Sequence, residues 1–138
     1  PLNHMVQAIL AASRKITVLR DPTRGGVGTT LNEIALQSDK GIRIFEEQIP
    51  VKKEVAGICE LLGFDPLYVA NEGKLLAFAL ESDVDAVLSA IRTDPAGADA
   101  CVIGEVTGAH PGRVVMETAI GGERIVDMQT GEQLPRIC

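Results

Sequence analysis

The chain has 138 residues, of which 46% are hydrophobic and 23% are charged, and its formal net charge is −6 at pH 7. This length and composition predict one globular domain that buries an aliphatic core without disulfide or metal crosslinks. The negative charge and the low aromatic content argue against nucleic acid as a partner, and no apolar run approaches the ~18 residues of a membrane span.

The first part of the chain alternates helical and strand patterns. Apolar residues at helical spacing over residues 2–10 predict a helix, with Asn3 as its N-cap, and a β-branched run predicts a strand over residues 16–20. After a turn over residues 21–28, Thr30 and Glu33 have the spacing of a capping box and predict the start of a second helix. Gly41 is the expected end of this helix, and residues 42–46 alternate as a strand.

The second part continues the alternation and ends in strands. A third helix follows Pro50, with Cys59 on its apolar face and Gly63 at its end. An almost continuously apolar run over residues 74–80 predicts a strand covered on both faces. Ser82 begins a fourth helix, which stops near Pro95. Strands are predicted over residues 101–106, 113–118 and 123–127 as a small antiparallel set.

These elements predict an α/β (α+β) fold in which a mixed sheet packs with helices. Residues 1–128 form the predicted domain, and residues 129–138 form a predicted mobile tail, because the helical and strand patterns stop there.

The three cysteines are far apart, and neither they nor the two histidines form a metal-binding or redox motif, so no metal site is predicted. Cys59 and Cys101 are expected to be small core residues. Free thiols and the lack of an apolar leader favour the cytoplasm. Cys138 is the last residue, where a thiol can reach the active site of another protein and act as a carrier. The alternative is an accidental cysteine on a tail.

A glycine-rich segment lies between a predicted strand and a predicted helix start. It reads Asp21-Pro22-Thr23-Arg24-Gly25-Gly26. Glycines allow close approach of the backbone, free N–H groups favour an anion, and Arg24 offers a cation suited to phosphate. The alternative is a glycine-rich turn with a surface arginine, because the segment matches neither the Walker A nor the Rossmann pattern.

Asn71, Glu72 and Gly73 precede the predicted apolar strand. A carboxylate at the mouth of an apolar sheet is partly desolvated, which would make Glu72 a usable general base. The alternative is a turn with a solvated glutamate.

Several motifs together carry a resemblance that spans essentially the whole chain. They are the glycine-rich segment, Asn71-Glu72-Gly73, the Gly121-Gly122 turn and the final Pro135-Arg136-Ile137-Cys138. In this combination the chain resembles the C-terminal half of the HypE family of hydrogenase maturation proteins. The terminal motif is the most specific, because the others are shared with aminoimidazole ribonucleotide synthetases and selenophosphate synthetases.

The resemblance implies an aminoimidazole ribonucleotide synthetase-like fold and an enzyme, a carbamoyl dehydratase. In that family the carbamoyltransferase HypF loads the terminal cysteine, here Cys138. ATP then drives dehydration to a thiocyanate, the source of cyanide for nickel–iron hydrogenase, which passes to a HypC–HypD complex. The resemblance implies that Glu72 is the base and that Pro135, Arg136 and Ile137 are recognised with the tail. Asp21, Thr23, Arg24, Gly25, Gly26 and Asn71 would lie near the transferring phosphate.

The resemblance also implies a homodimer whose N-terminal half binds most of the ATP and magnesium. The chain lacks that half, so we expect an excised domain that is inactive alone. Two alternatives remain open. One is a synthetase of the same superfamily, with Cys138 incidental, and the other is a non-catalytic module that presents a docking tail.

Overall fold

The structure is a computed structural model and describes residues 2–129. The chain divides into two compact units, where its length had predicted a single one. We call Pro1–Asp21 with Glu72–Cys101 the helical unit, and Pro22–Asn71 with Val102–Cys138 the sheet unit. Each unit is therefore assembled from two separate stretches of sequence.

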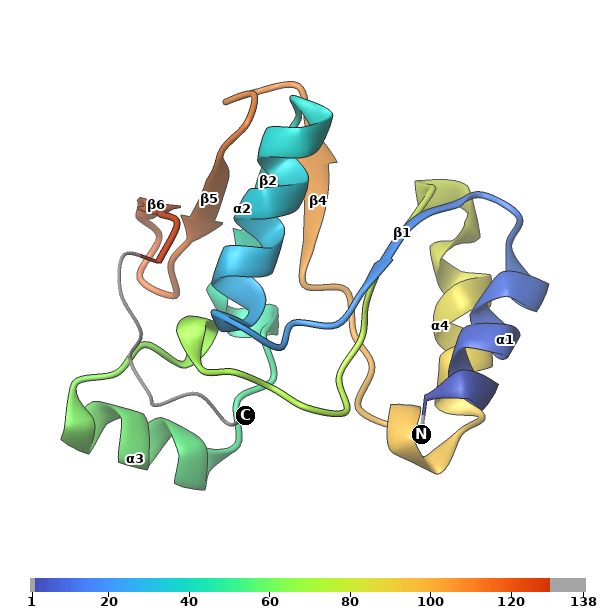
Figure 1. The fold of residues 1–138 in the computed structure, drawn as a ribbon, viewed down its shortest axis with the longest axis horizontal. Helices are drawn as coiled ribbons and strands as arrows, with labels where there is room; N and C mark the ends of the chain where they lie inside the picture. The colour runs from blue at the N-terminus through green and yellow to red at the C-terminus, as the bar shows by residue number, and fades with distance from the viewer. Residues whose placement is uncertain (1, 130–138) are drawn as a thin grey trace. The chain divides into compact units, whose positions relative to one another are not determined.

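The helical unit contains two helices and a two-stranded ribbon (Figure 1). Helix α1 (Asn3–Ala12) packs against α4 (Val84–Arg92), while β1 (Ile16–Arg20) pairs antiparallel with β3 (Leu76–Ala79). Short 3-10 turns, η3 (Glu81–Asp83) and η4 (Pro95–Gly97), flank α4. Met5, Ile9 and Val87 form its buried cluster, so the helical spacing of the apolar residues correctly predicted which face of α1 is buried.

Both predicted caps in this unit are wrong. Asn3 lies inside α1, whose N-cap is Leu2 without a side-chain hydrogen bond. Ser82 lies in η3, and its hydroxyl donates to Asp83 Oδ1 (2.8 Å). The hydroxyl of the buried Ser13 donates to Asp83 Oδ2 (2.6 Å), and this bond joins the end of α1 to the start of α4.

The sheet unit is built on a four-stranded mixed sheet with the order β4-β2-β5-β6. The strands are β2 (Gly41–Phe45), β4 (Gly104–Thr107), β5 (Val114–Glu117) and β6 (Glu123–Val126). Strand β2 pairs parallel with β5, and the other two pairings are antiparallel. The predicted mixed sheet is confirmed, but the last three strands are not a continuous antiparallel set, because β2 lies between β4 and β5.

Helix α2 (Gly26–Ser38) covers one face of this sheet (Figure 1). The residues buried beneath it are aliphatic, as the scarcity of aromatics predicted, and include Ile42, Ile44, Val114, Met116 and Val126. On the other face, Arg43 is paired with Glu117 (2.6 Å) and Glu123 (3.4 Å). The alternation of strand residues thus separates an apolar face from a charged one.

Helix α3 (Lys53–Leu62) ends at Gly63, which has a left-handed φ of 70°, as predicted. A 3-10 turn, η1 (Glu46–Gln48), precedes α3, and another, η2 (Pro66–Tyr68), follows it. The apolar side of α3 is mostly exposed. Cys59 is its one buried residue, whereas Ile58 is 58% exposed and Leu61 84% exposed.

Several predicted boundaries are wrong. The left-handed residue after α2 is Asp39 (φ 51°), and Gly41 instead begins β2. The predicted strand over residues 74–80 is only Leu76–Ala79, and it is partly exposed in a two-stranded ribbon. Cys101 is exposed and precedes β4, so it is not the core residue that was predicted, whereas Cys59 is buried.

Candidate functional site

The glycine-rich segment forms the N-terminus of α2. Gly25 (φ 68°) and Gly26 (φ 60°) adopt left-handed conformations, and the helix begins at Gly26. The capping box predicted at Thr30 and Glu33 is wrong, because Thr30 lies within the helix and its hydroxyl donates to the carbonyl of Gly26 (2.9 Å). The helix therefore starts at the glycines, where the N–H of Gly26 donates to the carbonyl of Thr23 (3.4 Å) and the positive end of the helix dipole suits an anion.

The 3-10 turn η2 and the residue after it pack directly against this loop. A side-chain carbon at Gly26 would overlap the carbonyl of Leu67 and lie 2.7 Å from that of Val69, so only glycine fits there. A side-chain carbon at Gly25 would overlap Thr29. Thr29 Oγ1 is buried without a hydrogen-bond partner among the residues that the structure describes. The start of α2 thus contains a buried hydroxyl group whose hydrogen-bonding capacity the described residues leave unused.

Asn71 lies beside the same loop. Its backbone N–H donates to the carbonyl of Pro22 (3.2 Å), and its Nδ2 donates to the carbonyl of Val69 (2.8 Å). Within the sheet unit, the structure therefore brings Asn71 together with the segment of Thr23, Arg24, Gly25 and Gly26. Thr23 is half-buried, and the guanidinium-bearing Arg24 is exposed.

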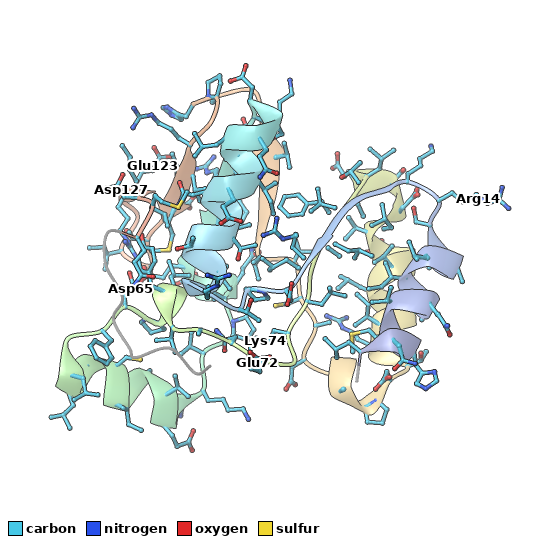
Figure 2. All side chains as sticks on the ribbon, viewed as in Figure 1. Arg14, Asp65, Glu72, Lys74, Glu123 and Asp127 are labelled. Atoms are coloured by element: carbon cyan, nitrogen blue, oxygen red, sulfur yellow. The ribbon has the colours of Figure 1, made fainter. Side chains whose placement is uncertain are left out.

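Asp21 and Glu72 belong to the helical unit. Asp21 is the last residue before the chain enters the sheet unit, and Glu72 is the first residue after the chain returns from it. Both are exposed. The desolvation expected for Glu72 is therefore wrong for this structure, since the strand that it precedes is neither long nor fully covered. Figure 2 shows Glu72 close to Lys74 on the segment that leads to β3.

The predicted carrier Cys138 and the predicted recognition residues Pro135, Arg136 and Ile137 lie outside the described residues. Within residues 2–129, no group of three or more His, Cys, Asp or Glu side chains could hold a metal ion. In the same range, no helix is long and apolar enough to cross a membrane.

Sequence reasoning missed the contribution of η2. Asp65 caps this turn by accepting from the backbone N–H of Leu67 (2.9 Å), and Pro66 occupies its first position. Asp followed by Pro is a typical signal for a helical turn and could have identified it. Tyr68, at the end of η2, lies against Gly28 of α2, where an added side-chain carbon would be 2.8 Å from the ring.

Desolvation by burial, then the negative charge of Asp65, raises the pKa of Tyr68 above its ordinary value of 10.0. Arg124, which forms an ion pair with Asp65 (2.8 Å), acts in the opposite direction. Tyr68 is therefore a neutral hydrogen-bond donor at physiological pH, and its hydroxyl donates to the carbonyl of Asp127 (2.8 Å).

The model of the family described as AIR synthase related protein, C-terminal domain, matches residues 1–117, and the chain belongs to this family. The chain is 51% identical over 137 residues to the carbamoyl dehydratase HypE of Rhodobacter capsulatus, and 52% identical over 137 residues to that of Azotobacter vinelandii. Each alignment covers 99% of this chain but 40% of the relative. The chain thus spans about two fifths of the length of these curated relatives.

Solved structures agree with this assignment. A crystal structure of the hydrogenase maturation protein HypE in complex with ATP matches 99% of the chain and 42% of its own length, with a TM-score of 0.91 and 48% identity. A HypE–HypF complex matches 92% of the chain and 41% of its own length, with a TM-score of 0.87 and 41% identity. These matches confirm the predicted fold class and the resemblance to HypE.

Proposed function

We propose that this chain is the C-terminal part of an ATP-dependent carbamoyl dehydratase that makes the cyanide ligands of nickel–iron hydrogenase. The observation that carries the proposal is the 51% identity to a carbamoyl dehydratase HypE over 99% of the chain. The glycine loop that Asn71 contacts supports it, because the N-terminus of α2 and the exposed Arg24 side chain both suit a phosphate.

The residues at the start of α2 fit a phosphate group. Gly25 and Gly26 leave room for close approach, Thr29 keeps an unpartnered buried hydroxyl, and Arg24 adds a positive charge. ATP, which a HypE neighbour binds, would supply the phosphoryl group that turns the carbamoyl oxygen into a leaving group. Magnesium and the adenine would be held by the N-terminal half of the full-length enzyme.

The chemistry assigns one role to each remaining residue. The Cys138 sulfur carries the carbamoyl group through a thioester-like S–C bond, which stays intact throughout. Phosphorylation of the carbamoyl oxygen by ATP releases ADP and one N–H proton, and Glu72 then accepts the second N–H proton as phosphate departs with the oxygen and the C≡N bond forms. A positioned general base typically contributes about 10²–10⁴ in rate. Asp21, Thr23 and Asn71 would lie near the phosphate.

The partners follow from the same proposal. HypF, with which a HypE neighbour forms a complex, would load Cys138, with Pro135, Arg136 and Ile137 as its recognition sequence. A HypC–HypD complex would receive the cyano group, and the full-length enzyme would be a cytoplasmic homodimer. The isolated chain would be inactive and would bind ATP no better than millimolar, equivalent to about −4 kcal/mol. Calorimetric titration of the chain with ATP tests that last point, and micromolar affinity would contradict it.

The test of the function is intact-mass analysis of the full-length enzyme incubated with HypF, carbamoyl phosphate and ATP. Wild type should acquire first a carbamoyl and then a cyano adduct on Cys138. Cys138→Ala should acquire neither, and Glu72→Gln should accumulate the carbamoyl form. Cys101→Ala is the matched control and should behave as wild type. Absence of any adduct on Cys138 would favour a synthetase with other chemistry or a docking module.

A further inference from the structure

The edge strand β6 leads directly into the C-terminal segment. Three side-chain interactions hold β6 and the residue after it, at Arg124, Val126 and Asp127. Arg124 is paired with Asp65 (2.8 Å). Asn32 Nδ2 donates to the carbonyl of Val126 (2.8 Å), and the Tyr68 hydroxyl donates to the carbonyl of Asp127 (2.8 Å). Figure 2 shows Asp65, Glu123 and Asp127 on the same side of the sheet unit.

The contact with Asp127 differs from the other two because it lies beyond the sheet. The pairing of β6 with β5 ends at Val126, so no ladder hydrogen bond holds Asp127. The Tyr68 ring is only half-buried, and its hydroxyl could be satisfied by water with no cost to the core. The hydrogen bond from Tyr68 therefore fixes the backbone at Asp127, which the pairing of β5 with β6 does not hold.

The turn that supplies Tyr68 also supports the candidate phosphate loop. The Tyr68 ring lies against Gly28, and the carbonyls on either side of Tyr68 lie against Gly26. Thus η2 contacts the first turn of α2 and, through one hydroxyl, the point where the C-terminal segment begins. The separation in sequence between Tyr68 and Asp127 is 59 residues.

We propose that Tyr68 is a positioning residue that fixes the chain just before the C-terminal tail, residues 129–138, beside the start of α2. The inference rests on the proposed function, in which Cys138 must return from HypF to the glycine loop. From Asp127 to Cys138 an extended chain reaches about 36 Å at roughly 3.3 Å per residue. For an arm of given length, the local concentration of its end at a target depends on where the arm begins. Anchoring Asp127 therefore favours the intramolecular step and leaves the encounter with HypF unaffected.

The experiment compares Tyr68→Phe with wild type in the full-length enzyme and measures two rates separately. One is the loading of Cys138 by HypF with carbamoyl phosphate, and the other is single-turnover dehydration of the preloaded enzyme after addition of ATP. A net hydrogen bond corresponds to a factor of roughly two to twelve in a local equilibrium. Loading should stay within about twofold of wild type, while dehydration should slow by about threefold to tenfold.

Amide hydrogen exchange provides a second readout that does not depend on activity. In Tyr68→Phe, a peptide covering residues 124–129 should exchange faster by a similar factor, while peptides from α2 should be unchanged. The Gly57→Ala variant, in the exposed α3, is the control and should change neither rate nor the exchange of residues 124–129.

The outcomes separate the two proposals. Wild type that never acquires a carbamoyl group on Cys138 overturns the proposed function and this inference with it. Active wild type with equal dehydration in Tyr68→Phe overturns the positioning role alone. A parallel loss of both rates together with a lower melting temperature would assign Tyr68 a purely structural role and also overturn the inference.

Discussion

Gly28 lies directly against the ring of Tyr68, so that a side-chain carbon at Gly28 would be 2.8 Å from the ring. The ring cannot easily move away, because its hydroxyl is bonded to Asp127 and the preceding residue, Leu67, is buried. The contact explains why the first turns of α2 tolerate several glycines, which are otherwise unfavourable in a helix.

We therefore predict that Gly28→Ala destabilises the protein. Overpacking typically costs about 1–3 kcal/mol, and the better helix propensity of alanine offsets only about 0.5–1 kcal/mol. Gly57→Ala in α3 is the matched control, because nothing lies within 4 Å of a side-chain carbon there. Urea denaturation should show a loss of stability for Gly28→Ala and a gain of about 0.5–1 kcal/mol for Gly57→Ala. Equal gains for both would refute the contact.

Tyr68 is the one tyrosine of the chain, which contains no tryptophan, so its ionisation can be followed directly by ultraviolet absorption. Desolvation and Asp65 raise its pKa above 10.0. The phenolate should form at higher pH in the folded chain than in denaturant. Because the folded pKa exceeds the unfolded one, the contribution of neutral Tyr68 to stability is complete below about pH 10 and is lost as the pH rises through the folded value.

Asp65→Asn tests the electrostatic part of that shift and should lower the midpoint of the titration in the folded state. A folded midpoint at or below that of the denatured chain would contradict the half-buried environment of the ring.

The bond between Ser13 and Asp83 predicts a pH dependence for the helical unit. Hydrogen bonds from Ser13 and then Ser82 hold the pKa of Asp83 below its usual 3.8. Since the folded pKa is depressed, the stabilisation is present above about pH 4 and is lost as the pH falls through the folded value. Ser13→Ala should lower the melting temperature at neutral pH and flatten its decline in acid. Ser89→Ala, at an exposed position of α4, should leave both unchanged.

The described cysteines should differ in reactivity. Cys59 is buried and Cys101 is exposed. Desolvation raises the pKa of Cys101, so its thiolate is scarce at neutral pH. Iodoacetamide should alkylate Cys101 slowly at pH 7 and faster as the pH rises, and should reach Cys59 only after unfolding. Peptide mass spectrometry would give the order, and early labelling of Cys59 in the native protein would contradict it.

Local patterns predicted much of the fold. The strand over residues 16–20 and the stop of α3 at Gly63 are as expected, because a β-branched run and a left-handed glycine act through neighbouring residues alone. The start of α2 was misplaced because Gly26 and Gly28 are poor helix formers, and their benefit comes from contact with η2. A contact between positions this far apart in sequence leaves no local signal.

The candidate site shows the same division. The glycine-rich motif identified Arg24, Gly25 and Gly26, and the resemblance grouped Asn71 with them. The structure adds the contact, in which the N–H of Asn71 donates to the carbonyl of Pro22. The desolvation of Glu72 was inferred from an apolar run whose partners could not be known from its own sequence. Tyr68 was overlooked because its role depends on the carbonyl of Asp127, which carries no side-chain signature.

The discontinuity of both units has a consequence for biosynthesis. Strand β1 is made before its partner β3, which follows only after the whole stretch of residues 22–71 has been synthesised. At about 5–20 residues per second, β1 would remain unpaired for roughly 3–10 s. Strand β2 also waits for a distant partner, because β5 follows it only after α3 and the second stretch of the helical unit have been made. Folding of each unit should therefore be slow, since neither unit can be completed before its second stretch of sequence has been synthesised.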